Sequence, residues 1–335
     1  MSALLTIVSL FFVPALYFIW QDIKTRTPTS KKIVTKNKVS QPLPIKTIDK
    51  EKVQIKKKNL IYEGDILEEL AKTNLHILFG VMSGGGKSTS MKVIIKKIHQ
   101  LNHSARFYIV DPKTTDWLGL QLYDDTVFYL SVEVLEQLIQ LKTITERIFN
   151  LLDNRIKSCQ DLLLSGEELP EPEHDVYLII DEWYSLYDSL KKLPPKIKAE
   201  YDLQSINLHI NTIIAKGREH KVHVFLVSQT HLATETGIST AMRRSIALVG
   251  QGRLTAEGDG GYASIEGIIN DSNVFKDSHK RNKLMKTLRS AIEVNENNLP
   301  IILTTMGKPR IGLLPDLSEI HGYKIKDYLL VEDLC

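Results

Sequence analysis

A short apolar run, a glycine-rich turn and an amphipathic stretch follow one another directly over residues 75–98. The run is LHILF, and the turn over residues 80–89 reads GVMSGGGKST. The stretch after the turn has a helical period and places one set of apolar residues on a single face, namely Met91, Ile94, Ile95 and Ile98. A glycine-rich turn between a strand and a helix lets consecutive backbone N–H groups converge on phosphate at the helix N-terminus. The segment therefore predicts a phosphate-binding loop in an α/β fold.

The turn also carries the side chains that such a loop requires. Lys87 is expected to contact the β- and γ-phosphates of a nucleoside triphosphate, and the Ser88 hydroxyl to hold magnesium. The expected phosphate-binding residues are Ser83, Gly84, Gly85, Gly86, Lys87, Ser88 and Thr89. The usual pattern has a glycine six residues before the lysine, where this chain has Val81, and Gly80 lies one residue early. The alternative interpretation is a plain turn without a ligand.

A second apolar run ends in two acids. Residues 176–180, VYLII, fit a parallel strand that is buried on both faces, and Asp181 and Glu182 follow at its carboxyl end. Asp181 is expected to bind magnesium through its water shell, and Glu182 to polarise the attacking water as a general base. The alternative is a strand that simply meets solvent. Together with the upstream loop, the pair favours an ATPase with ATP and Mg²⁺ as ligands.

Two further polar residues follow apolar segments. Gln229 comes after a strand over residues 223–227 and is a candidate sensor of hydrolysis, because ligands bind outside the carboxyl ends of such strands. Arg218 follows an amphipathic helix that starts near Leu203. It is a candidate to stabilise transition-state charge in a neighbouring subunit. The alternative for Arg218 is a helix-end partner or a solvated charge.

In their order and spacing, these motifs resemble the motor core of the FtsK/HerA superfamily, over about residues 60–320. The segments that carry the resemblance are residues 83–88 (SGGGKS), 107–113 (FYIVDPK), 178–182 (LIIDE), 216–218 (KGR) and 227–229 (VSQ). The Asp-Pro-Lys and Lys-Gly-Arg sequences are the more distinctive of these. The superfamily includes DNA translocases and the coupling ATPases of conjugation.

The resemblance implies an α/β P-loop NTPase (RecA-like) domain over residues 59–335, with a mostly parallel sheet and helices on both faces. It implies that ATP hydrolysis moves DNA through a homo-hexameric ring. Lys87, Ser88, Asp181 and Glu182 take their expected roles, Gln229 matches the family's sensor and Arg218 its arginine acting in trans. Val81 departs from the pattern. No DNA-reading domain is expected after the motor, so sequence-guided orientation on DNA is not expected.

The first 58 residues differ in character from the rest of the chain. Residues 3–20 carry no charge and cover roughly 27 Å as a helix, which predicts a transmembrane anchor over residues 1–22. A cleaved signal peptide and a buried core helix are the alternatives. Residues 23–58 are predicted to be a flexible basic linker. Their positive charge predicts a single-pass protein of the inner (cytoplasmic) membrane with its motor domain in the cytoplasm. The linker lysines are either solvated or in contact with anionic lipid.

Charge and cysteine content exclude some classes of protein. Residues 21–58 have twelve Lys/Arg and three Asp/Glu, whereas the whole chain has a net charge of only +3. The remainder is therefore net negative, which excludes a protein that coats DNA through overall charge. Two cysteines among 335 residues do not form a disulfide framework and fit a reducing compartment.

Local basic segments are candidate contacts for DNA, and plain solvated charge is the alternative interpretation. The first is expected in a loop soon after the acidic pair and contains Lys191, Lys192, Lys196 and Lys198. A second contains Lys280, Arg281, Lys283 and Lys286.

Residues 251–261 (QGRLTAEGDGG) are predicted to be an exposed loop. Residues 138–156 predict a long amphipathic helix that covers the sheet or, alternatively, pairs as a coiled coil, and residues 300–303 and 310–314 predict two closing strands.

The sequence therefore predicts a membrane-anchored ATPase that translocates DNA, with double-stranded DNA as its expected substrate. Conjugative transfer or maintenance of a mobile element is the process that the compact size favours, with secretion or mobilisation proteins as candidate partners. One rival hypothesis is an ATPase that drives virion or protein assembly or export. Another is a membrane-tethered nucleotide switch without motor activity.

Overall fold

The computed structural model describes residues 60–168, 174–254 and 261–317, which all lie in one compact unit, Asp49–Cys335. The predicted anchor over residues 1–22 and the predicted linker over residues 23–58 lie outside the described residues. Within the described ranges, no helix combines the length and the apolar character needed to cross a bilayer.

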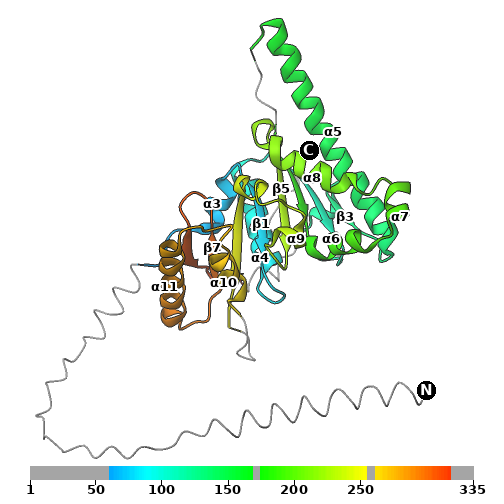
Figure 1. The fold of residues 1–335 in the computed structure, drawn as a ribbon. Coiled ribbons are helices and arrows are strands. Elements are labelled where there is room, and N and C mark those ends of the chain that lie inside the picture. The colour runs from blue at the N-terminus through cyan, green and yellow to red at the C-terminus, as the bar shows by residue number, and fades with distance from the viewer. Residues whose placement is uncertain (1–59, 169–173, 255–260, 318–335) are drawn as a thin grey trace, which may run out of the picture. The chain divides into compact units, whose positions relative to one another are not determined.

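The described chain is built on an eight-stranded sheet with the strand order β3-β2-β4-β5-β1-β6-β7-β8 (Figure 1). The strands are β1 (His76–Gly80), β2 (Arg106–Asp111), β3 (Val127–Tyr129), β4 (Val176–Ile180), β5 (Val222–Ser228), β6 (Ile246–Gly252), β7 (Ile301–Thr304) and β8 (Arg310–Leu313). The pairings from β3 through to β6 are parallel, and β7 and β8 are added antiparallel. The predicted mostly parallel sheet and the two closing strands are confirmed.

Helices cover the sheet. They are α3 (Ile66–Lys72), α4 (Lys87–Leu101), α5 (Val134–Ser165), α6 (Trp183–Lys192), α7 (Pro195–Glu200), α8 (Ser205–Lys216), α9 (Ala233–Thr236), α10 (Ala263–Asn270) and α11 (Ser278–Val294). Within the described ranges, the short 3₁₀ turns are η1 (Leu120–Leu122), η2 (Gly217–His220) and η3 (Met242–Ser245). Figure 1 shows the end of α5 projecting beyond the sheet.

Alternation along the central strands divides the core between the two faces of the sheet. Ile77, Phe79 and Ile179 pack with α3 and α4 on one face. Leu78 and Leu178 face the other way and pack with α5, α6 and α8. Because successive side chains of a strand point to opposite faces, a run that is apolar at every position requires cover on both sides. The predicted two-sided helical cover is therefore confirmed, with α5 lying over the sheet along its buried residues Leu138, Leu141, Ile144, Thr145, Ile148 and Leu152.

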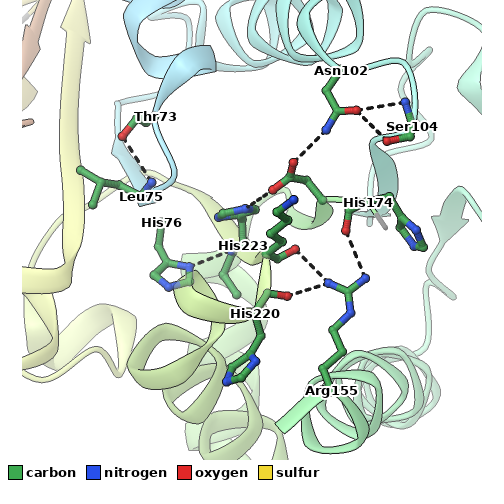
Figure 2. A network of polar contacts seen from close by, with 12 residues as sticks. Thr73, Leu75, His76, Asn102, Ser104, Arg155, His174, His220 and His223 are labelled. Carbon is green, nitrogen blue, oxygen red and sulfur yellow. Dashed lines mark hydrogen bonds and ion pairs between the residues drawn. The ribbon is translucent and has the colours of Figure 1, made fainter. Parts of the chain in front are cut away.

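A polar network joins the amino ends of the strands on the α5 side (Figure 2). Arg155 of α5 donates to the carbonyls of His220 at 2.6 Å and His174 at 3.1 Å. Asp175, just before β4, contacts His223 Nε2 at 3.0 Å and accepts from the Asn102 amide at 2.8 Å. These bonds satisfy backbone carbonyls at the ends of η2 and of the loop before β4. The network fixes the edge of the sheet that lies opposite the phosphate loop.

Candidate active site

The phosphate loop connects β1 to α4 as predicted. Gly84 and Gly86 have φ angles of 77° and 84°, in the left-handed region that glycine adopts without a Cβ penalty. The Gly85 N–H donates to the Met82 carbonyl at 3.1 Å, which closes the turn. Helix α4 then begins at Lys87 without an acidic residue in its first turn. Its first N–H groups have no intrahelical acceptor, so the turn is a ready-made anion site.

The departure at Val81 has a structural explanation. The Val81 side chain is fully buried in the core between the sheet and α4, and its N–H donates to the Ser228 carbonyl at 2.9 Å. A Cβ on Gly85 would lie 2.6 Å from Val81 Cγ1, so the valine packs directly under that glycine. The side chain that replaces the usual glycine therefore fills the space below the loop and does not enter the loop itself.

We expect Val81→Gly to destabilise the fold by about 2–4 kcal/mol, because it removes a buried side chain and adds backbone entropy to the unfolded chain. Thermal or urea unfolding measures this change. The matched control is Val132→Gly, whose valine is 92% exposed and whose loss should change stability by about 0.5 kcal/mol or less. Equal losses from the two variants would contradict the packing role of Val81.

Three residues, Lys87, Lys113 and Gln229, converge on Glu182. Its carboxylate forms ion pairs with Lys87 of the phosphate loop and with Lys113 after β2. Gln229, after β5, donates from Nε2 to Glu182 Oε2 at 3.0 Å. Glu182 itself has a φ of 51°, a left-handed conformation that is costly for a residue other than glycine and that gathers at functional sites. The carboxyl ends of four parallel strands thus meet at one carboxylate.

The pKa values of the two acids of the pair shift in opposite directions. Burial and the neighbouring charge of Glu182 raise the pKa of Asp181 to about 6, and Lys87 only partly opposes this shift. Burial acts in the same direction on Glu182, but hydrogen bonds from Lys113 and Lys87 outweigh it and leave the pKa of Glu182 below its ordinary value. Glu182 is therefore ionised at neutral pH, as a base must be. The charged form of Asp181 is disfavoured by its surroundings, so a cation beside it would stabilise that form.

Asp181 fits the metal role that the sequence predicts. It is fully buried, and its Oδ1 accepts from the Glu182 N–H at 2.9 Å while its Oδ2 has no hydrogen-bond partner. A buried carboxylate oxygen without a donor is destabilised unless a cation neutralises it. Hard oxygen donors such as this carboxylate and the Ser88 hydroxyl suit Mg²⁺. The residues present therefore fit a magnesium ion.

The loop after β2 contributes Lys113, which belongs to the Asp-Pro-Lys sequence of the family resemblance and for which the sequence predicts no role. The buried Asp111 carboxylate accepts from the backbone N–H groups of Lys113 at 2.7 Å and Thr115 at 2.6 Å, and from Trp117 Nε1 at 2.9 Å. These three bonds fix the loop so that Lys113 reaches Glu182. The only sequence signal was a charged Asp-Pro-Lys sequence directly after a strand in the same sheet.

Arg218 does not join this cluster. It is exposed in η2, just before β5, whereas Gln229 and Glu182 follow the carboxyl ends of β5 and β4. Because those strands are parallel, Arg218 lies at the opposite edge of the sheet from the phosphate loop of the same chain. Its predicted action on a neighbouring subunit stays a prediction.

The predicted loop of DNA-binding lysines is wrong in its secondary structure. Lys191 and Lys192 end α6, and Lys196 and Lys198 lie in α7. Pro195 occupies the first turn of α7, a position where proline favours helix, so the Pro-Pro pair starts a helix here. Asp188 contacts Lys192 Nζ at 2.6 Å and Lys191 Nζ at 3.9 Å, which partly neutralises the group.

The predicted exposed loop over residues 251–261 is also wrong at its start. Gln251 and Gly252 are the buried last residues of β6, and residues 255–260 lie outside the described residues.

A recess of about 420 Å³ lies beside the phosphate loop, lined by Gly85, Gly86, Thr89, Gln251, Arg253, Asn298 and others. A larger recess of about 950 Å³ lies elsewhere, between the start of β2 and α5, and touches none of the predicted site residues.

Comparison with known proteins gives similarities at the level of structure. No family model and no curated protein sequence matches the chain. The pCW3 conjugation coupling protein TcpA, solved as a monomer with ATPγS, is 17% identical with a TM-score of 0.48, over 76% of this chain and 64% of that chain. The cytoplasmic domain of EssC is 15% identical with a TM-score of 0.40, over 72% and 39% of the two chains.

Thermomonospora curvata EccC (ATPases 2 and 3), solved in complex with a signal sequence peptide, is 18% identical with a TM-score of 0.38, over 54% of this chain and 32% of that chain. The chain thus spans less than two thirds of each of these three proteins. The fold itself rests on the strand order, the phosphate loop after β1 and the acidic pair after β4. The chain has the P-loop NTPase fold and resembles the ATPases of the FtsK/HerA superfamily.

Proposed function

We propose that this chain is a membrane-anchored ATPase that hydrolyses ATP to move DNA through a homo-oligomeric ring. The observation that carries the ATPase activity is the convergence of Lys87, Lys113 and Gln229 on the buried Glu182 carboxylate. A carboxylate that only stabilised the fold would need no more than one cationic partner. Three donors from three separate loops around one carboxylate, next to an anion-binding helix terminus, support a site built for phosphate chemistry.

The residues divide the reaction among themselves. Lys87 and the first N–H groups of α4 bind the β- and γ-phosphates, so nucleotide entry draws Lys87 away from Glu182. The carboxylate, released from Lys87, accepts a proton from a water molecule, and the oxygen of that water attacks the γ-phosphorus while the bond to the ADP oxygen breaks. Gln229 stays bonded to Glu182 at 3.0 Å and so links the state of that carboxylate to the loop after β5. Ser88 directly, and Asp181 through a water shell, would hold a magnesium ion, which would neutralise charge at the phosphates.

The motor function rests on features outside this cluster. The exposed Arg218 cannot serve the site of its own chain, and a closed ring is the arrangement in which it can serve the next one. The lysines of α6 and α7 follow Glu182 directly in the chain, so helix α6 links the hydrolysis site to a basic surface that suits DNA phosphates. The anchor over residues 1–22 would hold the ring at the inner membrane. Conjugative transfer is the process that we favour.

We expect duplex DNA to raise the ATPase rate of the purified full chain several-fold at low salt, and the stimulation to fade as salt rises. Phosphate contacts weaken with ionic strength, so the effect must follow the salt concentration. A coupled assay of phosphate release, with and without duplex DNA, measures this. Glu182→Gln is the background control, and Lys196→Glu combined with Lys198→Glu should reduce the stimulation without lowering the rate measured in the absence of DNA.

The same assay separates the rival functions. A rate that is substantial but unchanged by DNA at every salt concentration would overturn translocation and favour an ATPase of virion or protein assembly or export. Nucleotide binding without turnover would favour a membrane-tethered switch. Single-stranded DNA in a parallel arm tests the choice of duplex as the substrate.

A further inference from the structure

The carboxyl end of strand β6 carries a buried polar side chain that the proposed chemistry does not use. Gln251 is 1% exposed. Its Nε2 donates to the Gly85 carbonyl at 2.7 Å, and its Oε1 accepts from the Ser90 hydroxyl at 2.7 Å. One end of this amide therefore holds the phosphate loop and the other end holds the first turns of α4. We call this pair of bonds the Gln251 brace.

The brace sets the direction of the peptide plane between Gly85 and Gly86. In a trans peptide the carbonyl and the following N–H point in opposite directions, and the peptide bonds described in this loop are trans. Gln251 draws the Gly85 carbonyl toward β6, so the Gly86 N–H is directed away from β6. An N–H held in this way is available to an anion at the start of α4.

Without the brace, this plane is free to rotate. Gly84 and Gly86 both have positive φ angles, and glycines accept either side of the backbone map at little cost. A reversed plane would present the Gly85 carbonyl oxygen to the bound phosphates and would repel them. Gln251 also lies close to Gly86, because a Cβ there would lie 2.9 Å from Gln251 Nε2. The small residue and the long amide fit each other.

We propose that Gln251 is a positioning residue that pre-organises the phosphate loop for nucleotide. The inference rests on the proposed function, in which this loop binds ATP. Gln251 touches neither Glu182 nor Gln229 among the hydrogen bonds of the described residues, so it acts on binding and not on the hydrolytic step. Losing a hydrogen bond of this kind changes an equilibrium by about 2- to 12-fold.

The test uses Gln251→Met in the full chain, because methionine keeps the length of the side chain and removes both hydrogen bonds. Titration with ATP and with ADP should show both dissociation constants rising by about 2- to 12-fold. KM for ATP should rise in parallel, with kcat changed less than KM. Gln160→Met, at an exposed site on α5, is the matched control. Wild-type affinity in Gln251→Met, or a fall in kcat alone, would overturn the proposal.

A second variant restores the brace conditionally. In Gln251→Glu an ionised carboxylate faces the Gly85 carbonyl and repels it, whereas a protonated carboxyl can donate to that carbonyl and still accept from Ser90. Burial favours the protonated form. The affinity of Gln251→Glu for ATP, relative to wild type at the same pH, should therefore recover between pH 8 and pH 6. A deficit of the same size at both pH values contradicts the brace.

Hydrogen exchange separates this inference from the proposed function. In the nucleotide-free protein, amides of residues 82–89 should exchange faster in Gln251→Met than in wild type, with the central strands unchanged. Wild-type protein that retains no ATP would refute the proposed function, while the exchange comparison would still decide the brace. Unchanged exchange in this loop would refute the brace even if ATP binds.

Discussion

Replacing Glu182 with glutamine is expected to lower ATP turnover by about 10²–10⁴-fold, the usual contribution of a positioned general base. Nucleotide binding should survive and become tighter, because Lys87 loses the carboxylate that competes with phosphate for its charge. Single-turnover phosphate release gives the first quantity, and titration with ATP gives the second. The two changes in opposite directions distinguish a catalytic base from a carboxylate that only holds the fold together.

A matched control variant and a limiting turnover value show whether the effect belongs to Glu182 alone. Glu133→Gln, at an exposed site before α5, is the matched control and should leave both quantities at their wild-type values. Turnover within about tenfold of wild type in Glu182→Gln would exclude this residue as the base. Since Lys113 also pairs with Glu182, Lys113→Ala should give a smaller fall in turnover than the loss of the carboxylate itself.

Replacing Lys87 with alanine should weaken ATP binding and also slow hydrolysis. Its charged hydrogen bonds to phosphate are worth about 1.5–3 kcal/mol, which corresponds to a loss of ATP affinity of roughly 10- to 150-fold. Turnover at saturating ATP should fall by a further factor of about 10²–10³, because a pre-organised donor to the transition state is lost. Titration and steady-state kinetics measure the two losses, and Lys157→Ala on the exposed side of α5 serves as the control.

The same variant tests the ring. Subunits with Lys87→Ala bind ATP weakly and turn it over slowly but still offer Arg218, whereas subunits with Arg218→Ala keep an intact phosphate loop. If Arg218 acts on the next subunit, mixing the two inactive proteins should restore part of the ATPase activity. Activity of Arg218→Ala alone at the wild-type rate would show that the arginine has no role in hydrolysis.

Much of this molecule is predictable from the sequence because its central strands are short, apolar at every position and followed at once by polar residues. The strand containing Ile179 ends at Asp181 and Glu182, and a buried strand with two acids at its carboxyl end has few other interpretations. Glycine spacing around Lys87 identifies the loop in the same way. In both places local pattern and tertiary position agree, so reasoning from either gives the same answer.

The errors fall where a tertiary contact decides a residue's environment. Gln251 begins a polar, glycine-rich segment that is typical of a loop, yet its side chain is buried because both ends of its amide find partners. Those partners, Gly85 and Ser90, are more than 150 residues away in the chain, and local composition carries no trace of them. The lysines of α7 lie in a helix and not in the predicted loop for a different reason, since Pro195 stands in the first helical turn, where proline favours helix.

The strand order has a consequence for the newly synthesised protein. β1 is made early, but its neighbours β5 and β6 are the fourth and fifth strands to follow it along the chain. A nascent polypeptide therefore exposes its phosphate loop before either flanking strand exists, and neither Glu182 nor Gln251 is yet present to hold it. A nascent chain that ends before residue 252 lacks the part of β6 that carries Gln251, so the proposed nucleotide site is incomplete until that segment has been translated.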